Sequence, residues 1–171
     1  MSVGNWKTAV AVVLLVLTVL GYWKYRQPRF AAGERLPDVA FGLSDGREAR
    51  LSEWRGKYVL VHFWGSWCGP CRAENRELSR LYAKYQERGF DIISIGIEQT
   101  REAWEQAVQT DGLVWPHHVL ELERFDGPLA RRFQVRAIPT TFLVNAEGVI
   151  MGVNLTPEQI ERMLREALNG T

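Results

Sequence analysis

The sequence predicts an α/β domain with a mixed central sheet, preceded by one apolar N-terminal helix. Two apolar runs, residues 57–64 and 91–97, lack polar alternation and are typical of central strands buried on both faces. The amphipathic stretch between them, residues 72–88, favours a helix that connects two strands of one sheet. With 46% hydrophobic residues and a formal net charge of +1, the chain has material for a core. Because its charge is balanced, we expect no nucleic-acid partner.

The apolar helix lies within residues 1–25, which are typical of a membrane anchor. Sixteen uncharged residues, Thr8 to Trp23, are dense in Val, Leu and Ala and are flanked by interfacial aromatic side chains. They span about 24 Å, less than the about 30 Å of a hydrocarbon core, although residues 22–25 can extend the helix. A cleaved signal peptide is the alternative, with Ala31-Ala32-Gly33 as its cleavage site. That site lies far beyond the apolar run, so an uncleaved anchor is favoured.

The orientation of this anchor is less well determined by its residues. Lys24, Arg26 and Arg29 follow the segment while only Lys7 precedes it, which favours a cytoplasmic domain. The absence of cysteines outside one motif instead suits an oxidising compartment. Residues 26–35 mix charges, proline and glycine without periodicity and predict a linker, so that the folded domain comprises residues 36–171.

The remaining elements can be placed in order along the domain. Two short strands on either side of Ser44-Asp45-Gly46 predict a hairpin. Thr156 as N-cap, Pro157 at the first helical position and Gln159 three residues after the cap predict the start of the last helix. The other predicted elements are the hairpin strands at 38–43 and 47–51, a helical turn at 52–55, helices at 101–110 and 128–133, and strands at 140–144 and 149–153.

Both cysteines lie in one pentapeptide, Trp67-Cys68-Gly69-Pro70-Cys71, between a buried strand and a long helix. Two thiols separated by two residues can close a disulfide. The helix N-terminus lowers the pKa of the first thiol and supplies a thiolate at neutral pH. We therefore expect Cys68 to be the nucleophile and Cys71 the resolving thiol, with Trp67, Gly69 and Pro70 shaping the site.

Other uses of a cysteine pair are less consistent with the sequence. A structural zinc site needs about four ligands, and beyond the two cysteines the chain offers only His62, His117 and His118. A covalent haem site would have histidine where Arg72 follows the second cysteine. A purely structural disulfide would join distant segments. Thiol–disulfide exchange is the best account, and we expect no metal and no cofactor besides the redox-active disulfide.

Three motifs in this order resemble the thioredoxin superfamily, and within it the membrane-anchored thiol-disulfide oxidoreductases of the TlpA and ResA kind. They are the segment from Phe63 to Glu74, the segment from Ala137 to Val144, and an Asn-x-x-Gly turn at residues 145–148. The resemblance covers about residues 36–168. It implies a thioredoxin fold with an N-terminal β-hairpin and a central insert at about residues 99–125.

The resemblance also implies a reaction and a setting. The Cys68 thiolate would attack a client disulfide, and Cys71 would then release the reduced client. Pro139 would be cis and face the cysteines, leaving the backbone at Ile138 to pair with an extended substrate beside Thr140. The partners would be disulfide-bearing proteins and a membrane electron donor of the thiol-disulfide type. The protein would be a single-pass monomer of the cytoplasmic membrane, with its domain on the periplasmic side, acting in redox homeostasis and cytochrome c biogenesis.

Two side chains are candidates for the proton that this cycle moves. Glu74 is three residues after Cys71, on the core-facing side of the helix, and a partly buried carboxylate there should have a raised pKa and accept the Cys71 proton. The resemblance supports this role, because ResA-like proteins carry a functional glutamate at that position. His62 stands six residues before the nucleophile, where thioredoxin has a buried aspartate. It is interpreted as a hydrogen-bonded core histidine, with a proton relay as the alternative.

Two functional alternatives stay open from the sequence. A thioredoxin-like groove could bind clients as a chaperone, with the cysteines serving only to hold them. A thiol peroxidase is the second alternative, although its usual Thr-x-x-Cys pattern is absent. His117 and His118 are adjacent in an extended segment and point to opposite faces, so they are expected to have surface or packing roles.

Overall fold

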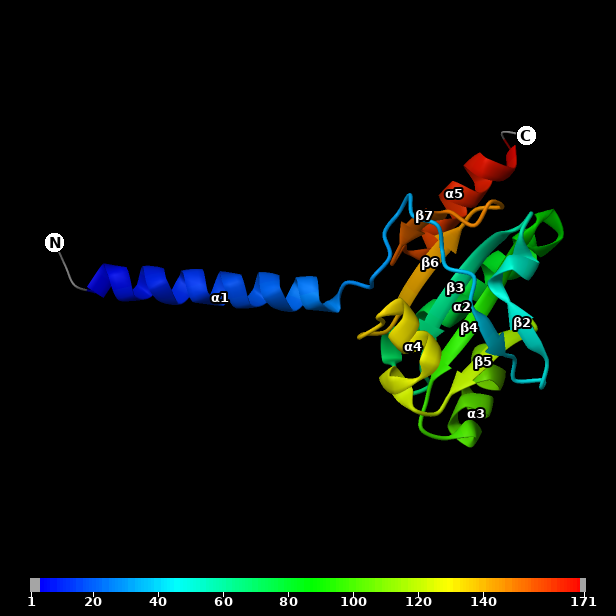
Figure 1. Ribbon diagram of the computed structural model, residues 1–171, viewed down its shortest axis with the longest axis horizontal. Helices are drawn as coiled ribbons and strands as arrows, with labels where there is room; N and C mark the ends of the chain where they lie inside the picture. Colours follow the sequence, from blue (N-terminus) through cyan, green and yellow to red (C-terminus); the bar gives the residue numbers. More distant parts are fainter. Residues whose placement is uncertain (1–3, 170–171) are drawn as a thin grey trace.

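A five-stranded mixed sheet forms the centre of the domain in the computed structural model, which describes residues 4–169 (Figure 1). The strand order is β5-β4-β3-β6-β7. The central strand β3 (Tyr58–Trp64) pairs parallel with β4 (Phe90–Ile97) and antiparallel with β6 (Thr140–Val144). The outer strands are β5 (His117–Glu121), parallel to β4, and β7 (Ile150–Val153), antiparallel to β6. The predicted mixed α/β architecture is confirmed.

The two faces of the sheet are covered by different elements. Alternate residues of β3 point to opposite faces, as the period of a strand requires: Val61 and Phe63 join one core cluster, whereas Leu60 and Trp64 join the other. The second cluster is closed by α2, α3 and α5, and the first by α4 and the N-terminal hairpin. These helices are α2 (Gly69–Tyr85), α3 (Arg101–Asp111), α4 (Pro128–Phe133) and α5 (Pro157–Asn169).

The apolar N-terminal segment forms a helix, α1 (Gly4–Arg26), that projects away from the domain (Figure 1). Its stretch Trp6–Tyr25 has a mean hydropathy of 1.7 and is long and apolar enough to cross a membrane. Twenty residues at 1.5 Å each span about 30 Å, so the helix supplies the length that the sixteen-residue run lacks. α1 is therefore a candidate membrane anchor.

The segment after α1, which the sequence predicts as a linker, lies against the domain. The Gly33 amide donates to the Ile150 carbonyl at 2.8 Å, and the Ile150 amide donates to the Glu34 carbonyl at 2.8 Å. Arg35 and Val149 form a single antiparallel bridge. These contacts depend on the outer strand β7, which is far away in sequence, so the local composition of residues 26–35 could not indicate them.

The hairpin after this segment is shorter than predicted but has the predicted turn. Its strands, β1 (Ala40–Gly42) and β2 (Glu48–Arg50), pair antiparallel, and Gly46 has a φ of +91° in the turn. The Ser44 amide donates to the His118 carbonyl at 2.7 Å, which places the hairpin beside β5. A 3-10 turn, η1 (Leu51–Trp54), leads to β3, and two others are η2 (Gln86–Arg88) and η3 (Arg124–Asp126).

The insert contributes the strand β5, which the sequence indicated only as an extended segment. Its two histidines point to opposite faces, as predicted. His117 contacts the buried carboxylate of Asp91 at 3.2 Å, whereas the ring of His118 packs on Trp104 and Trp115. Both histidines therefore have packing roles.

The capping box of the last helix is also confirmed. The Gln159 amide donates to Thr156 Oγ1 at 3.4 Å, and the Thr156 amide donates to Gln159 Oε1 at 2.8 Å.

Candidate active site

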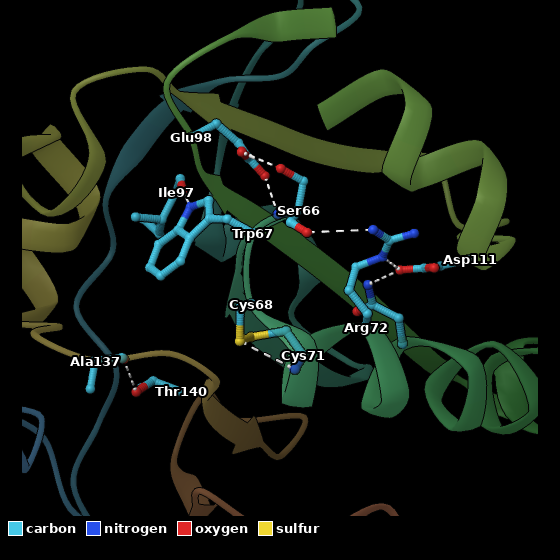
Figure 2. The surroundings of a disulfide bond; sticks show 11 residues. Ser66, Trp67, Cys68, Cys71, Arg72, Ile97, Glu98, Asp111, Ala137 and Thr140 are labelled. Atoms are coloured by element: carbon cyan, nitrogen blue, oxygen red, sulfur yellow. Dashed lines mark hydrogen bonds and ion pairs between the residues drawn. A yellow bond between two sulfur atoms is a disulfide. The ribbon is translucent and has the colours of Figure 1, made fainter. Parts of the chain in front are cut away.

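Cys68 and Cys71 form a disulfide at the start of α2 (Figure 2), with an S–S distance of 2.10 Å. Cys68 is the N-cap residue, and its sulfur accepts a hydrogen bond from the Cys71 amide at 3.2 Å. Pro70 lies in the first turn, where its missing N–H costs nothing. Cys71 is fully buried while Cys68 is 6% exposed, so Cys68 is the sulfur that an incoming disulfide can reach. The helix N-terminus stabilises a thiolate at that sulfur.

A cis-proline segment lies beside the disulfide (Figure 2). The Ile138–Pro139 peptide bond is cis, as predicted. Thr140 Oγ1 donates to the Ala137 carbonyl at 2.8 Å and holds the turn closed. Within residues 4–169, the backbone N–H and C=O of Ile138 have no hydrogen-bond partner. An extended client peptide can therefore pair with this backbone, in the manner of an added strand.

Glu74 lies one turn after Cys71 on α2. It is half-buried in a groove that Pro139 and Leu155 also line. Across the described part of the chain, nothing donates a hydrogen bond to its carboxylate or forms an ion pair with it. Burial alone raises the pKa of Glu74 from 4.5 to about 7. The predicted upward shift is confirmed. The side chain can exchange a proton near neutral pH.

His62 is fully buried on β3. Its pKa is lowered to about 3, mainly by burial and to a smaller extent by the nearby His118. Ser94 Oγ accepts from Trp115 Nε1 at 2.9 Å and lies 3.2 Å from His62 Nδ1. Nε2 has no partner among the residues described. A group with this pKa stays neutral at pH 7 and is a poor proton acceptor.

A second glutamate, which the sequence did not single out, fixes the loop before Cys68. Glu98 is 1% exposed and accepts hydrogen bonds from both the amide and the hydroxyl of Ser66 (Figure 2). Burial raises the pKa of Glu98, while the Ser66 hydrogen bonds and the charges of Arg124 and Arg72 oppose the rise. Its position directly after the buried strand β4 was the available signal, because sites in α/β sheets form at the carboxyl ends of parallel strands.

The same loop is held from its other side by Arg72 (Figure 2). The Arg72 Nη1 donates to the Ser66 carbonyl at 3.4 Å, and its Nε donates to the buried carboxylate of Asp111. Asn75 Nδ2 donates to the same carboxylate oxygen at 2.9 Å. Asp111 therefore links α3 to α2, and Ser66 is fixed between an acidic and a basic side chain.

Trp67 is 47% exposed beside the cysteines, yet its ring is fixed on two sides. Its Nε1 donates to the Ile97 carbonyl at 2.7 Å, and the Arg124 guanidinium lies 4.4 Å from the ring centroid. A β-carbon at Gly65 would come within 2.8 Å of Trp67 Nε1, so a side chain at Gly65 would displace the ring. The insert thus supplies Arg124 as part of the surface next to the reactive sulfur.

The comparisons with known proteins agree with this site. The family described as Redoxin matches residues 31–169, which include the disulfide, Glu74 and the cis-proline segment. The chain belongs to the redoxin family. Within the thioredoxin superfamily it is of the TlpA/ResA kind, as its motifs indicated.

Two curated relatives of this redoxin are named thiol-disulfide oxidoreductases. The thiol-disulfide oxidoreductase ResA of Geobacillus kaustophilus is 32% identical over 162 residues, covering 90% of this chain and 91% of the relative. The ResA of Bacillus subtilis is 27% identical over 163 residues and covers 92% and 88%. The redoxin described here is a thiol-disulfide oxidoreductase.

Solved structures support the same fold for this redoxin. The thioredoxin domain of a thiol-disulfide oxidoreductase from Bacteroides vulgatus superposes with a TM-score of 0.72 at 28% identity, covering 82% of this chain and 99% of that one. A thiol:disulfide interchange protein from Bacteroides sp. gives 0.71 at 26% identity and covers 83% and 93%. The predicted thioredoxin fold is confirmed.

Proposed function

We propose that this redoxin reduces disulfides of extracytoplasmic proteins, with Cys68 as nucleophile and Cys71 as resolving thiol. The observation that supports it best is the position of the more exposed sulfur, at a helix N-terminus and beside the unpaired backbone of Ile138. A client strand that pairs there carries its disulfide to Cys68. The ResA relatives, which are named thiol-disulfide oxidoreductases, favour this catalyst over a chaperone or a peroxidase.

Each turnover moves two electrons to the client. The Cys68 thiolate attacks one client sulfur, the client S–S bond breaks, and the other client sulfur leaves and takes up a proton. Cys71 then loses its proton and attacks Cys68, which breaks the mixed disulfide and releases the second client thiol. The product is the Cys68–Cys71 disulfide of this structure. A membrane protein with a dithiol of its own reduces it for the next cycle.

Glu74 takes the Cys71 proton during the second step. The carboxylate must be ionised to accept it, and with a pKa of about 7 the side chain has similar populations of both forms near neutral pH. It returns the proton when the disulfide is reduced again. Trp67, Gly69 and Pro70 shape the loop, while Pro139 and Thr140 hold the client-binding segment in place. His62 serves as a neutral core side chain.

α1 anchors the domain as a monomer in the cytoplasmic membrane with the catalytic site outside the cytoplasm. The disulfides of proteins folding there are the substrate class. These clients include c-type cytochromes before haem attachment, whose paired cysteines must be reduced. An alkaline phosphatase fused after residue 171 should therefore be active, and the mature protein should begin at or next to its first residue. An inactive phosphatase fusion together with an active cytoplasmic reporter would reverse the orientation.

Thiol trapping tests the chemistry. Cys68→Ser should abolish insulin reduction, whereas Cys71→Ser should accumulate mixed disulfides with client proteins in native membranes. Iodoacetamide should label reduced Cys68 well below pH 8 and Cys71 poorly, because a helix N-terminus depresses a cysteine pKa to about 3.5–7.5. Retained turnover in Cys68→Ser would refute the mechanism.

A further inference from the structure

The end of α1 contacts the domain next to the cis-proline segment. Arg136 Nη1 donates to the Tyr25 carbonyl at 3.2 Å, and the Arg136 guanidinium lies 4.3 Å from the Tyr25 ring centroid. Tyr25 is the last residue of the stretch that is long enough to cross a membrane. Arg136 is therefore at the level where that helix would leave the hydrocarbon core, which is where arginine and tyrosine side chains meet lipid headgroups.

A second contact fixes α4 to the same segment. The Arg29 amide donates to the Phe133 carbonyl at 3.2 Å, and the Phe30 ring meets the Phe133 ring edge-on with centroids 5.8 Å apart. In Figure 1, α4 lies on the side of the domain nearest α1. Two separate contacts therefore hold this side of the domain toward the membrane end of the helix.

The side chains gathered here are mostly basic and exposed. Within residues 127–137 there are three arginines and no acidic residue, and Glu34 is the one acidic residue of the segment 26–35. Arg131 is ion-paired with the exposed Asp126 of η3 at 3.1 Å, while Arg29 and Arg132 have no ion-pair partner within residues 4–169. We call five exposed basic residues at or next to these contacts the juxtamembrane basic face: Lys24, Arg29, Arg131, Arg132 and Arg136.

We propose that the juxtamembrane basic face binds anionic phospholipid headgroups and holds the domain on the bilayer with its client-binding segment near the membrane surface. The inference rests on the proposed anchoring by α1. Pro139 is three residues from Arg136, so their Cα atoms are at most about 11 Å apart. Positive side chains at this level are attracted to anionic leaflets over a distance of about one Debye length.

This placement has a consequence for the reaction partner. A membrane-embedded electron donor presents its thiols at the bilayer surface, and a domain held there meets them at a high effective concentration. A freely swinging domain would spend most of its time elsewhere. The basic residues after α1 are thus assigned to lipid binding, in addition to any effect on topology.

Hydrogen exchange of the full chain in lipid nanodiscs tests the proposal. Discs of phosphatidylcholine alone are compared with discs that contain about one third phosphatidylglycerol. Amides of residues 128–137 should exchange about fivefold or more slowly in the anionic discs, since each basic side chain near an anionic surface contributes about that factor. Raising the salt to about 1 M, where the Debye length is about 3 Å, should remove the difference.

Two charge-reversal variants, one in the juxtamembrane basic face and one in α5 as a control, test whether these arginines cause the lipid dependence. Arg29→Glu with Arg132→Glu should abolish the lipid dependence and leave insulin reduction unchanged, because neither side chain lies at the disulfide. Arg162→Glu with Arg165→Glu, two exposed arginines of α5, has the same change of charge and should keep the dependence.

Two results would overturn the proposal in distinguishable ways. Equal exchange in neutral and anionic discs, with the protein inserted in both, would remove the headgroup site and leave the anchor intact. Failure of the chain to insert in either disc would remove the anchor and the headgroup site together.

Discussion

Glu74, one turn after Cys71, and Glu98, which binds Ser66, are two glutamates near the disulfide, and burial raises the pKa of both. Glu98 accepts two hydrogen bonds from Ser66 and is near the charges of Arg72 and Arg124. Glu74 has no such partner in the described chain. Donors that bind a carboxylate stabilise its ionised form. The surroundings therefore favour proton exchange near neutral pH at Glu74 and a hydrogen-bond acceptor role at Glu98.

The largest expected effect is on the free energy of unfolding, and it distinguishes Glu74 from Glu98. The pKa of Glu74 is raised from 4.5 to about 7, so the folded state binds its proton more tightly than the unfolded chain. The contribution of Glu74 to the free energy of unfolding is fully present below pH 4.5 and is lost as the pH rises through 7. The total loss is about 3 kcal/mol. Glu74→Gln should therefore gain about 3 kcal/mol over the wild type between pH 4.5 and 8.

Denaturant unfolding of the oxidised full chain in detergent measures this. The comparison must be between variant and wild type, because buried His62 and His118 have lowered pKa values and change stability with pH in the opposite sense. Their effects cancel in the difference. A difference that stays constant with pH would show that Glu74 does not titrate near neutrality.

The next effect is on the rate of resolution. Glu74→Gln should slow the release of a client from the Cys68 mixed disulfide by about 100-fold at pH 8, since general base catalysis contributes about that factor or more. The wild-type rate should rise through pH 7 as the carboxylate ionises, and the variant should lose that rise. Rapid-quench measurements from pH 5 to 9 test this. If Glu74→Gln kept wild-type rates and His62→Ala did not, the proton would belong to His62.

Glu98 should behave as a structural group in the same assays. Glu98→Gln replaces one acceptor oxygen with a donor amide, so that one Ser66 donor loses its partner at a cost of about 2 kcal/mol. The unfolding free energy should fall by about that amount at pH 5 and by less at pH 8, because the wild type itself loses stability as Glu98, with its raised pKa, ionises. The rise of the resolution rate through pH 7 should persist. A variant that lost this rise would give Glu98 a share of the proton transfer.

The smallest effect concerns the surface next to the reactive sulfur. Arg124→Ala removes the guanidinium over Trp67, an interaction worth about 0.5–1 kcal/mol at an exposed site. The KM for a protein client should rise a few-fold, while reduction of a small disulfide such as oxidised glutathione should be unchanged. An equal loss with both substrates would place Arg124 in the chemistry rather than in client contact.

The position of Glu74 beside the cysteines was predictable, whereas that of Glu98 was not. Cys68, Cys71 and Glu74 follow from spacing along one helix, because residues three apart share a face whatever the tertiary structure. The cis bond before Pro139 came from the family resemblance, since local sequence rarely determines it. Glu98 is separated from Ser66 by more than thirty residues, and only the pairing of β3 with β4 brings them together.

The docking of the end of α1 and of the segment after it could not be predicted for the same reason. The contacts of Tyr25 with Arg136 and of Arg29 with Phe133 join residues about one hundred positions apart. Residues 26–35 show no helical or strand period, and such a pattern predicts a linker. Their partners are backbone carbonyls and rings that only the folded domain presents.

The N-terminal part of the chain also covers the outer strands of the sheet. β5 and β7 are the two edges, and an exposed edge offers unpaired backbone groups to other chains. The hairpin meets β5 through Ser44 and His118, while residues 33–36 bond along β7. A chain that lacks both the hairpin and the residues before it would expose both edges. Such a truncated protein would keep its redox motif and lose protection against edge-to-edge self-association.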